Sequence, residues 1–169
     1  VYQGEELGLP EVTDLPDEVR QDPSFFRAEG QDGFRDGCRV PIPWSGTKAP
    51  YGFGPVAGGP SWLPQPDSWA RLSVAAQTGD PDSTLELYRT AIALRRRLPA
   101  LGAGDTVEWQ EISEEVLAFS RPGLLCVLNT GPRELRLPSP GRLLLASTPF
   151  DADAATVCIP ADSCAWWAI

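Results

Sequence analysis

The sequence predicts a mixed architecture in which one α/β unit precedes a small all-β domain. Three observations predict it: an apolar start broken by a glycine, one strongly amphipathic helix in mid-chain, and a run of short β-rich segments after that helix. Of the 169 residues, 42% are hydrophobic and 22% are charged, which is typical of a globular protein.

The first segment, VYQGEELGL, is expected to contain the end of a β-strand. Val1, Tyr2 and Gln3 would form this strand end, Gly4 would break it, and two carboxylates follow immediately. The order strand, glycine and acid is typical of a functional edge where a strand enters a loop in α/β folds. An ordinary turn is the alternative interpretation.

A long segment without periodicity follows, from Pro10 to about Gly79, and it holds most of the 18 prolines. A loop of about 70 residues is far longer than the usual connection of 2–6 residues between a strand and a helix. Disordered segments are poor in aromatic residues. This segment carries eight aromatic residues, namely Phe25, Phe26, Phe34, Trp44, Tyr51, Phe53, Trp62 and Trp69. We therefore expect an ordered, packed loop with short helical turns near Pro16–Arg20 and Trp69–Gln77.

One clear helix is expected over DPDSTLELYRTAIALRRRLPAL, from Asp80 to Leu101. Asp80 suits the N-cap and Pro81 suits the first helical position, while Pro99 and Gly102 end the helix. Its apolar residues recur at helical spacing and form a broad face for core packing: Leu85, Leu87, Tyr88, Ala91, Ile92, Leu94 and Leu98. The basic run 95–97 suits the negative end of the helix dipole.

Seven short segments rich in β-branched and aromatic residues follow Gly104. They are TVEWQEI, VLAFSR, LLCVLN, ELRLP, RLLLAST, TVCIP and CAWWAI, and turn residues separate them. Short strands at this spacing predict a small antiparallel sandwich or curled sheet. Trp109 alternates with Val107, which predicts that both face the core.

A lone strand and a lone helix cannot bury a core, so the order of elements suggests a larger framework. We expect the last βα unit of a (β/α)8 TIM barrel with a long βα loop, followed by a small antiparallel β-sandwich. The expected domains are residues 1–102 and 103–169. Because the sequence starts at Val1 and contains no methionine, we expect it to be a fragment. A processed mature protein is the alternative.

The composition also argues against several classes of function. The net charge of -9 disfavours binding to nucleic acid. No apolar run approaches the roughly 20 residues of a membrane helix, and no secretory signal is visible. We therefore expect a cytoplasmic protein without a membrane partner.

The chain lacks histidine, so it cannot hold a Cys/His zinc site or a Ser-His-Asp or Cys-His catalytic set. We expect no metal and no cofactor. The four cysteines, Cys38, Cys126, Cys158 and Cys164, are expected to be reduced, buried thiols. A Cys158–Cys164 disulfide is the alternative.

The segment RDGCRVPIPW, residues 35–44, holds the candidate site residues Arg35, Asp36 and Arg39. Barrel active sites lie in the loops after the carboxyl ends of strands, and residues 4–79 would be such a loop. An arginine offers a planar fork of donors for hydroxyls or carboxylates, and it keeps a nearby acid ionised. Arg35 and Asp36 suit either a sugar site or a scaffold that holds the loop, whereas the site is favoured for Arg39.

YQGEELGLP followed by RDGCRVPIPW closely resembles glycoside hydrolase family 13, in its α-glucosidase and oligo-1,6-glucosidase branch. The second motif matches at Arg35, Asp36, Arg39, Pro41 and Trp44, and the first matches over residues 2–8. The helix is similar to the family's eighth barrel helix at Ser83, Tyr88, Leu94, Arg95 and Leu101. The β-rich remainder resembles the family's C-terminal β domain.

The resemblance implies that residues 1–102 hold strand 8, its loop and helix 8 of a catalytic barrel. It also implies retaining hydrolysis of α-glucosidic bonds in maltose- or isomaltose-type oligosaccharides. The acids that perform it, a nucleophilic aspartate, a glutamic acid/base and a further aspartate, would all precede Val1. The chain is therefore expected to contain no catalytic residue and to be inactive by itself.

The resemblance also suggests roles for individual residues. Arg39 would line the substrate pocket, and Arg35 and Asp36 would bind substrate or shape the loop beside it. Glu6 is expected to brace the barrel rim by hydrogen bonding, and Trp44 to shape the site. The expected partner is a small oligosaccharide.

Two other interpretations stay open. Trehalose synthases and sucrose-processing enzymes are close relatives within the family, and this stretch of sequence does not separate them from α-glucosidases. A non-catalytic carbohydrate-binding or scaffold module is the alternative from another class. It would need exposed aromatic residues on the β domain, for which Trp109, Trp166 and Trp167 are candidates.

Overall fold

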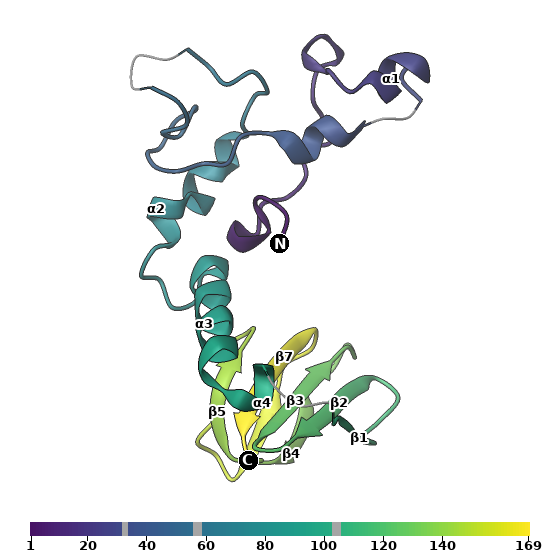
Figure 1. Ribbon diagram of the computed structural model, residues 1–169, viewed down its shortest axis with the longest axis vertical. Helices are drawn as coiled ribbons and strands as arrows, with labels where there is room; N and C mark the ends of the chain where they lie inside the picture. Colours follow the sequence, from purple (N-terminus) through teal and green to yellow (C-terminus); the bar gives the residue numbers. More distant parts are fainter. Residues whose placement is uncertain (32–33, 56–58, 103–105) are drawn as a thin grey trace. The chain divides into compact units, whose positions relative to one another are not determined.

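The computed structural model describes residues 1–31, 34–55, 59–102 and 106–169. The chain divides into two compact units, Val1–Glu86 and Leu87–Ile169. Figure 1 shows that the first unit consists of short helices and loops, and that the second contains all the described strands.

The N-terminal unit is built from short helical turns joined by irregular backbone. They are the 3-10 helices η1 (Glu5–Leu7), η2 (Asp17–Val19), η3 (Phe34–Arg39) and η4 (Asp67–Leu72), and the α-helices α1 (Pro23–Arg27) and α2 (Val74–Gln77). The helical turns predicted near Pro16–Arg20 and Trp69–Gln77 are confirmed by η2, η4 and α2. The sequence prediction did not include α1 and η3.

The prediction of a strand end at residues 1–3 is wrong, because these residues form no strand in the structure. The carbonyl of Tyr2 instead accepts a hydrogen bond from the N–H of Glu5, at 3.2 Å, and Gly4 turns the chain with φ of 94°. A strand needs a neighbouring strand to accept and donate its backbone hydrogen bonds. Among the described residues, none pairs with this segment in a sheet.

The long loop packs on itself, as expected. Its apolar cluster consists of Val12, Leu15, Val40, Tyr51, Leu63 and Trp69, all of them buried. The hydroxyl of Tyr51 lies within hydrogen-bonding distance of two backbone carbonyls, those of Pro66 at 3.1 Å and Asp67 at 3.2 Å. Four other aromatic residues of the loop are exposed, namely Phe26, Trp44, Phe53 and Trp62. Only part of the aromatic content is therefore used for packing.

Helix α3 (Thr84–Arg97) begins three residues after the expected first helical position, Pro81. The side chain of Asp80 accepts the N–H of Asp82 at 3.1 Å, which forms a turn before the helix. Ser83 is the actual N-cap, because its hydroxyl accepts the N–H of Glu86 at 3.2 Å. Helix α4 (Pro99–Gly102) follows.

The predicted apolar face of the helix is only partly buried. Leu94 is buried, but Ile92 is 45% exposed, so its inclusion in the core face was wrong. At about 100° per residue, Ile92 lies about 140° around the helix from Leu87, which faces the β domain. The side chain of Ile92 therefore points away from the apolar stripe of the helix that packs against the β domain.

All seven predicted strands are confirmed. They are β1 (Glu108–Gln110), β2 (Val116–Arg121), β3 (Leu124–Asn129), β4 (Leu135–Pro138), β5 (Arg142–Ala146), β6 (Thr156–Ile159) and β7 (Ser163–Ala168). Five of them form one sheet in the order β1-β2-β3-β7-β5, while β4 and β6 form a second sheet. Every described pairing is antiparallel.

The core of the C-terminal unit lies between these two sheets. Val157 and Ile159 of β6 pack with Ala118, Val127, Ala165 and Trp167 of the larger sheet. Along β7, alternate residues are buried, as expected for a strand with one face on the core. Trp167 is fully buried and its ring lies 6.2 Å from that of Phe150.

The prediction that Trp109 and Val107 face the core is wrong, because they are 65% and 47% exposed. Trp109 pairs with Phe119, whose neighbour in β2, Ala118, faces the core. Successive side chains of a strand point to opposite faces, so Trp109 lies on the outer face of the sheet. The rings of Trp109 and Phe119 meet edge-to-face, with their centroids 5.8 Å apart.

The four cysteines are free, so the alternative Cys158–Cys164 disulfide is not formed. The sulfur of Cys164 instead lies 3.8 Å from that of Cys126. Cys126 is buried, whereas Cys38, Cys158 and Cys164 are only partly buried. Within the described ranges, no helix is both long and apolar enough to cross a membrane.

Candidate functional site

The two sequence motifs of the N-terminal unit line one hollow. Residues 2–5 contribute from the first motif, and Gly37 and Cys38 contribute from the second. Val40 of the second motif also lines the hollow, and the rest of the lining comes from Leu9, Pro10, Glu11 and Trp69. Segments more than 30 residues apart in the sequence are thus brought together.

Gly37 allows this close approach. A Cβ atom at this position would lie 2.3 Å from the carbonyl oxygen of Val12, which is closer than any real contact. The same two residues are joined by a hydrogen bond of 3.2 Å from the N–H of Val12 to the carbonyl of Gly37. The backbone at Val12, shortly after the first motif, therefore packs directly against Gly37 of η3.

Asp22, which the sequence reasoning missed, is the centre of the charged cluster. Its carboxylate accepts two hydrogen bonds from Arg35, from Nε at 2.8 Å and from Nη2 at 3.1 Å. It also caps α1 by accepting the N–H of Ser24 at 2.9 Å. The sequence contained a signal for the cap, because an aspartate before a proline suits the start of a helix. It contained none for the arginine partner.

The expected adjacent pair of Arg35 and Asp36 is therefore not a pair in the structure. Asp36 is fully buried and accepts the backbone N–H groups of Gln21 at 2.8 Å and Asp22 at 2.9 Å. These bonds join η3 to the segment that starts α1. Asp36 therefore holds the loop together.

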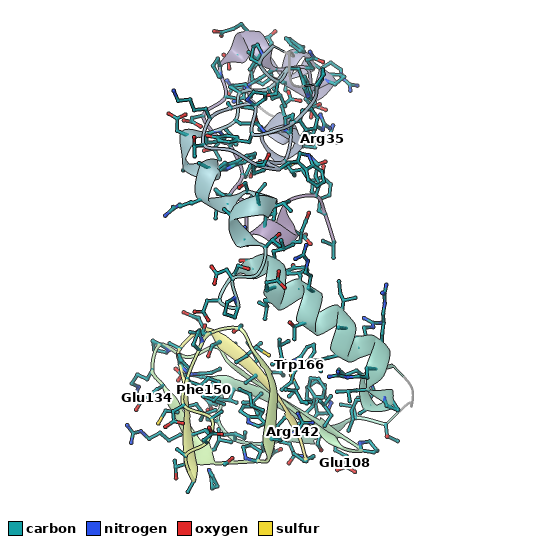
Figure 2. The ribbon with its side chains drawn as sticks, turned by 90° about the vertical axis from the view of Figure 1, so that its left-hand side faces the viewer. Arg35, Glu108, Glu134, Arg142, Phe150 and Trp166 are labelled. Carbon is teal, nitrogen blue, oxygen red and sulfur yellow. The ribbon has the colours of Figure 1, made fainter. Side chains whose placement is uncertain are left out.

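Arg39 binds to both buried carboxylates through one nitrogen. Its Nη1 lies 3.2 Å from Asp36 and 3.6 Å from Asp22. The side chain of Arg39 is 36% exposed, and that of Arg35, labelled in Figure 2, is 63% exposed. The guanidinium of Arg39 is thus held at one edge while part of its surface faces solvent.

The electrostatics of the cluster favour an ionised Asp22. Arg35, by direct hydrogen bonding, holds the pKa of Asp22 well below its usual range, and the N–H of Ser24 and the charge of Arg39 act in the same direction. Two carboxylates face two guanidinium groups, so their formal charges cancel. The cluster therefore offers a guanidinium, that of Arg39, which two buried carboxylates hold in place.

Glu6 and Trp44 make contacts outside this cluster. The carboxylate of Glu6 accepts the N–H of Gly4 at 3.0 Å, so it holds its own turn. Trp44 is 47% exposed, and its backbone is bonded to Tyr51 and Ala75. Its indole is a flat apolar surface open to solvent.

Tyr2 and Cys38 connect the two motifs directly. The sulfur of Cys38 lies 3.9 Å from the hydroxyl of Tyr2 and 3.0 Å from the carbonyl oxygen of Arg35. The contact with Cys38 raises the pKa of Tyr2. In the described parts of the chain, no group of three or more acidic or cysteine side chains is arranged to hold a metal ion.

A helical, loop-rich unit that brings two motifs to one hollow, followed by an antiparallel β domain, is the arrangement expected for part of an amylase-type glycoside hydrolase. The model of the alpha-amylase catalytic domain matches residues 1–104, so the chain belongs to the alpha-amylase family. A probable alpha-glucosidase of Rhizobium meliloti (strain 1021) is 38% identical over 121 residues, which cover 72% of this chain and 21% of that protein.

Other relatives carry different activities in their names. The trehalose synthase/amylase TreS of Mycobacterium tuberculosis is 29% identical over 151 residues, covering 83% of this chain and 22% of its own length. Among solved structures, the alpha-glucosyl transfer enzyme XgtA matches with a TM-score of 0.75 and 29% identity, over 98% of this chain and 32% of that one. The chain spans about a fifth of the length of the curated relatives it matches.

Proposed function

We propose that the chain is the C-terminal part of a retaining α-glucosidase that hydrolyses maltose- or isomaltose-type oligosaccharides. Residues 1–102 would form the last strand, loop and helix of its catalytic barrel, and residues 103–169 its C-terminal β domain. The end of the family match at residue 104 supports this boundary. The similarity to a probable alpha-glucosidase supports the activity.

The observation that carries the proposal is the anchored, partly exposed guanidinium of Arg39. A planar cation fixed at one edge suits hydrogen bonding to sugar hydroxyls, and its charge would favour ionised acids nearby. Arg35 and Asp36 would serve the substrate site by fixing the loop, together with Asp22. Glu6 would shape the rim by holding the turn at Gly4, and Trp44 by offering an apolar face to a sugar ring.

In the proposed enzyme, the reacting acids would lie in barrel segments that precede this chain. In such an enzyme an aspartate attacks the anomeric carbon and a glutamic acid protonates the leaving oxygen, each supplied by another barrel strand. The part played by this chain would be to bind and orient the sugar. The enzyme would work in the cytoplasm, without a cofactor and without nucleic acid or membrane partners.

A second candidate is transglycosylation or isomerisation within the same family. It is favoured by the similarity to a trehalose synthase/amylase. Product analysis of the full-length protein with maltose separates the candidates, because hydrolysis yields glucose and isomerisation yields trehalose.

The role of Arg39 is tested by Arg39→Ala in the full-length protein that contains this chain. We expect kcat/KM for an aryl α-glucoside to fall about 100-fold, the loss typical of removing one positioned charge-stabilising donor. We expect little change in the melting temperature, because the side chain is partly exposed and lies at the surface of the cluster.

Arg71→Ala is the matched control, since Arg71 is an exposed arginine of the same unit. It should leave kcat/KM unchanged. Arg39→Lys should recover part of the loss, because it keeps the charge but not the planar fork. An Arg39→Ala protein with normal kcat/KM would show that Arg39 only holds the loop.

The non-catalytic alternative rests on the exposed Trp109 of the outer sheet face. Titration of the chain with maltose, compared with its Trp109→Ala variant, tests it. Saturable binding that depends on Trp109 would favour a carbohydrate-binding module.

A further inference from the structure

Two cysteines converge on the outer face of the larger sheet. Cys126 of β3 lies opposite Trp166 of β7, and Cys164 lies two residues before Trp166 on the same strand. A period of two along β7 places Cys164 and Trp166 on one face of the sheet, the face that also carries Cys126. The two sulfur atoms are 3.8 Å apart.

The backbone on both sides of this contact is fixed by hydrogen bonds. Cys126 is in the middle of β3, where it pairs with Phe119 of β2 and with Trp166 of β7. Cys164 donates its N–H to the hydroxyl of Ser147 at 2.8 Å, and its carbonyl accepts the N–H of Ser147 at 2.8 Å. The two strands therefore hold the thiols close to each other, and disulfide formation requires the sulfur atoms to approach from 3.8 Å to about 2.05 Å.

Cys126 and Cys164 differ in their access to solvent. Cys126 is only 8% exposed. Cys164 lines an apolar pocket with Trp166, Leu145 and Ser147 of the sheet side and with Leu87, Tyr88 and Ala91 of α3. Figure 2 shows Trp166 on the side of the sheet that faces α3. A small uncharged molecule can enter such a pocket, and Cys164 is the thiol it would meet.

The contact also makes the two thiols chemically unequal. Hydrogen bonding from Cys126 lowers the pKa of Cys164 to about 7, with a further contribution from Trp166. The pKa of Cys126 is raised by the same contact and by burial. The thiolate is the reactive form of cysteine, so Cys164 is the better nucleophile near neutral pH.

We propose that Cys126 and Cys164 form a peroxide-reactive pair that closes into a disulfide between β3 and β7. The Cys164 thiolate attacks one oxygen of hydrogen peroxide, the O–O bond breaks, and Cys164 becomes a sulfenic acid while hydroxide leaves. The Cys126 thiol then attacks the sulfenic sulfur, the S–S bond forms, and water leaves. Overall, two thiols lose two electrons and two protons, and one peroxide becomes two waters.

The remaining cysteines do not compete for this step. Cys158 lies on β6, in the two-stranded sheet, and pairs there with Arg136. Cys38 belongs to η3 of the N-terminal unit, where its sulfur contacts the carbonyl of Arg35. The structure thus selects one of the six possible cysteine pairs.

The experiment uses the folded 169-residue chain and hydrogen peroxide in small excess. After quenching, the chain is unfolded, free thiols are alkylated, and the protein is digested with trypsin and an enzyme that cuts before aspartate. Cutting before Asp162 separates Cys164 from Cys158. We expect the free thiols to fall from four to two, with a linked peptide pair containing Cys126 and Cys164. The rate should rise between pH 6 and pH 8.

Variants keep the result interpretable. Cys38→Ser combined with Cys158→Ser should leave the loss of two thiols unchanged, and Cys126→Ser should stop the reaction at a sulfenic acid on Cys164 that a dimedone-type reagent labels. Retention of all four thiols, a Cys158–Cys164 link, or a sulfinic acid on Cys164 without a link in the unmodified chain would overturn the proposal. A dimedone label on Cys126 in the Cys164→Ser chain, with none on Cys164 in the Cys126→Ser chain, would overturn the order of attack.

Discussion

Asp22 organises the N-terminal unit more than any residue that the sequence singled out. It is fully buried, caps α1 and binds both Arg35 and Arg39. A buried carboxylate with this many donors is stabilised as an anion. The position of Arg39, on which the proposed sugar site depends, therefore rests on a residue 17 positions earlier in the chain.

The first prediction concerns Asp22→Asn and pH. Because the folded-state pKa of Asp22 lies below its ordinary value of about 3.9, its ionisation stabilises the fold above about pH 4, and this stability is lost as the pH falls. The variant should melt lower than the unmodified chain at pH 7, and the gap should shrink from about pH 4 downward.

Melting temperatures of both chains between pH 2 and pH 7 check this. Asp14→Asn, an exposed aspartate of the same unit, is the control and should follow the unmodified chain at every pH. Parallel curves for Asp22→Asn and the unmodified chain would contradict the assignment.

The second prediction concerns Gly37→Ala. The added Cβ would meet the carbonyl oxygen of Val12 at 2.3 Å, so the backbone of η3 or of its neighbour must move. Overpacking of this kind typically costs about 1–3 kcal/mol. Urea unfolding should report a loss in this range, whereas Gly59→Ala, where the Cβ meets nothing within 4 Å, should change stability little. Equal effects of the two substitutions would refute the close-contact explanation.

At the scale of elements, the start of α3 distinguishes two candidate caps. The sequence favoured Asp80, while in the structure the hydroxyl of Ser83 accepts the N–H of Glu86. We therefore predict that Ser83→Ala costs about 1 kcal/mol, the usual loss of an N-cap. Asp80→Ala should cost less, since its carboxylate supports only the preceding turn. Chemical denaturation of both variants measures the two losses of stability. A larger loss for Asp80→Ala than for Ser83→Ala would show that Asp80 is the N-cap, as the sequence predicted.

The β domain offers a similar contrast between two tryptophans. Trp167 is fully buried between the sheets, and Trp109 is 65% exposed on the outer face of the edge strand. Truncation of a buried tryptophan typically costs about 3–5 kcal/mol. We predict a loss of this size for Trp167→Ala and a change within about 0.5 kcal/mol for Trp109→Ala, both from denaturant unfolding. A large loss for Trp109→Ala would mean that the outer face is part of the core.

At the scale of the whole molecule, the proposed function predicts an inactive chain. The acids of the described site are bound by arginines, and the proposed function assigns the reacting acids to barrel segments outside this sequence. The purified 169-residue chain should therefore show no hydrolysis of an aryl α-glucoside above the uncatalysed rate. Measurable turnover, abolished by Arg39→Ala, would show that the chain carries its own catalytic groups.

The sequence by itself determined the features that depend on near neighbours. Strand segments separated by turn residues located all seven strands, and apolar spacing located α3, because these patterns record how a local segment meets water and the core. The paired motifs at residues 2–8 and 35–44 likewise indicated the family that the match over residues 1–104 supports.

Only the tertiary structure decided which distant residues meet. Arg35 is adjacent to Asp36 in sequence, but it pairs with Asp22, 13 positions away. Trp109 faces outward, and Cys164 meets Cys126 across two strands. These outcomes depend on strand register and on the path of irregular backbone, which are set by non-local hydrogen bonds and close contacts such as that of Gly37 with Val12. Local patterns do not encode such contacts, because each arises from the packing of the whole unit.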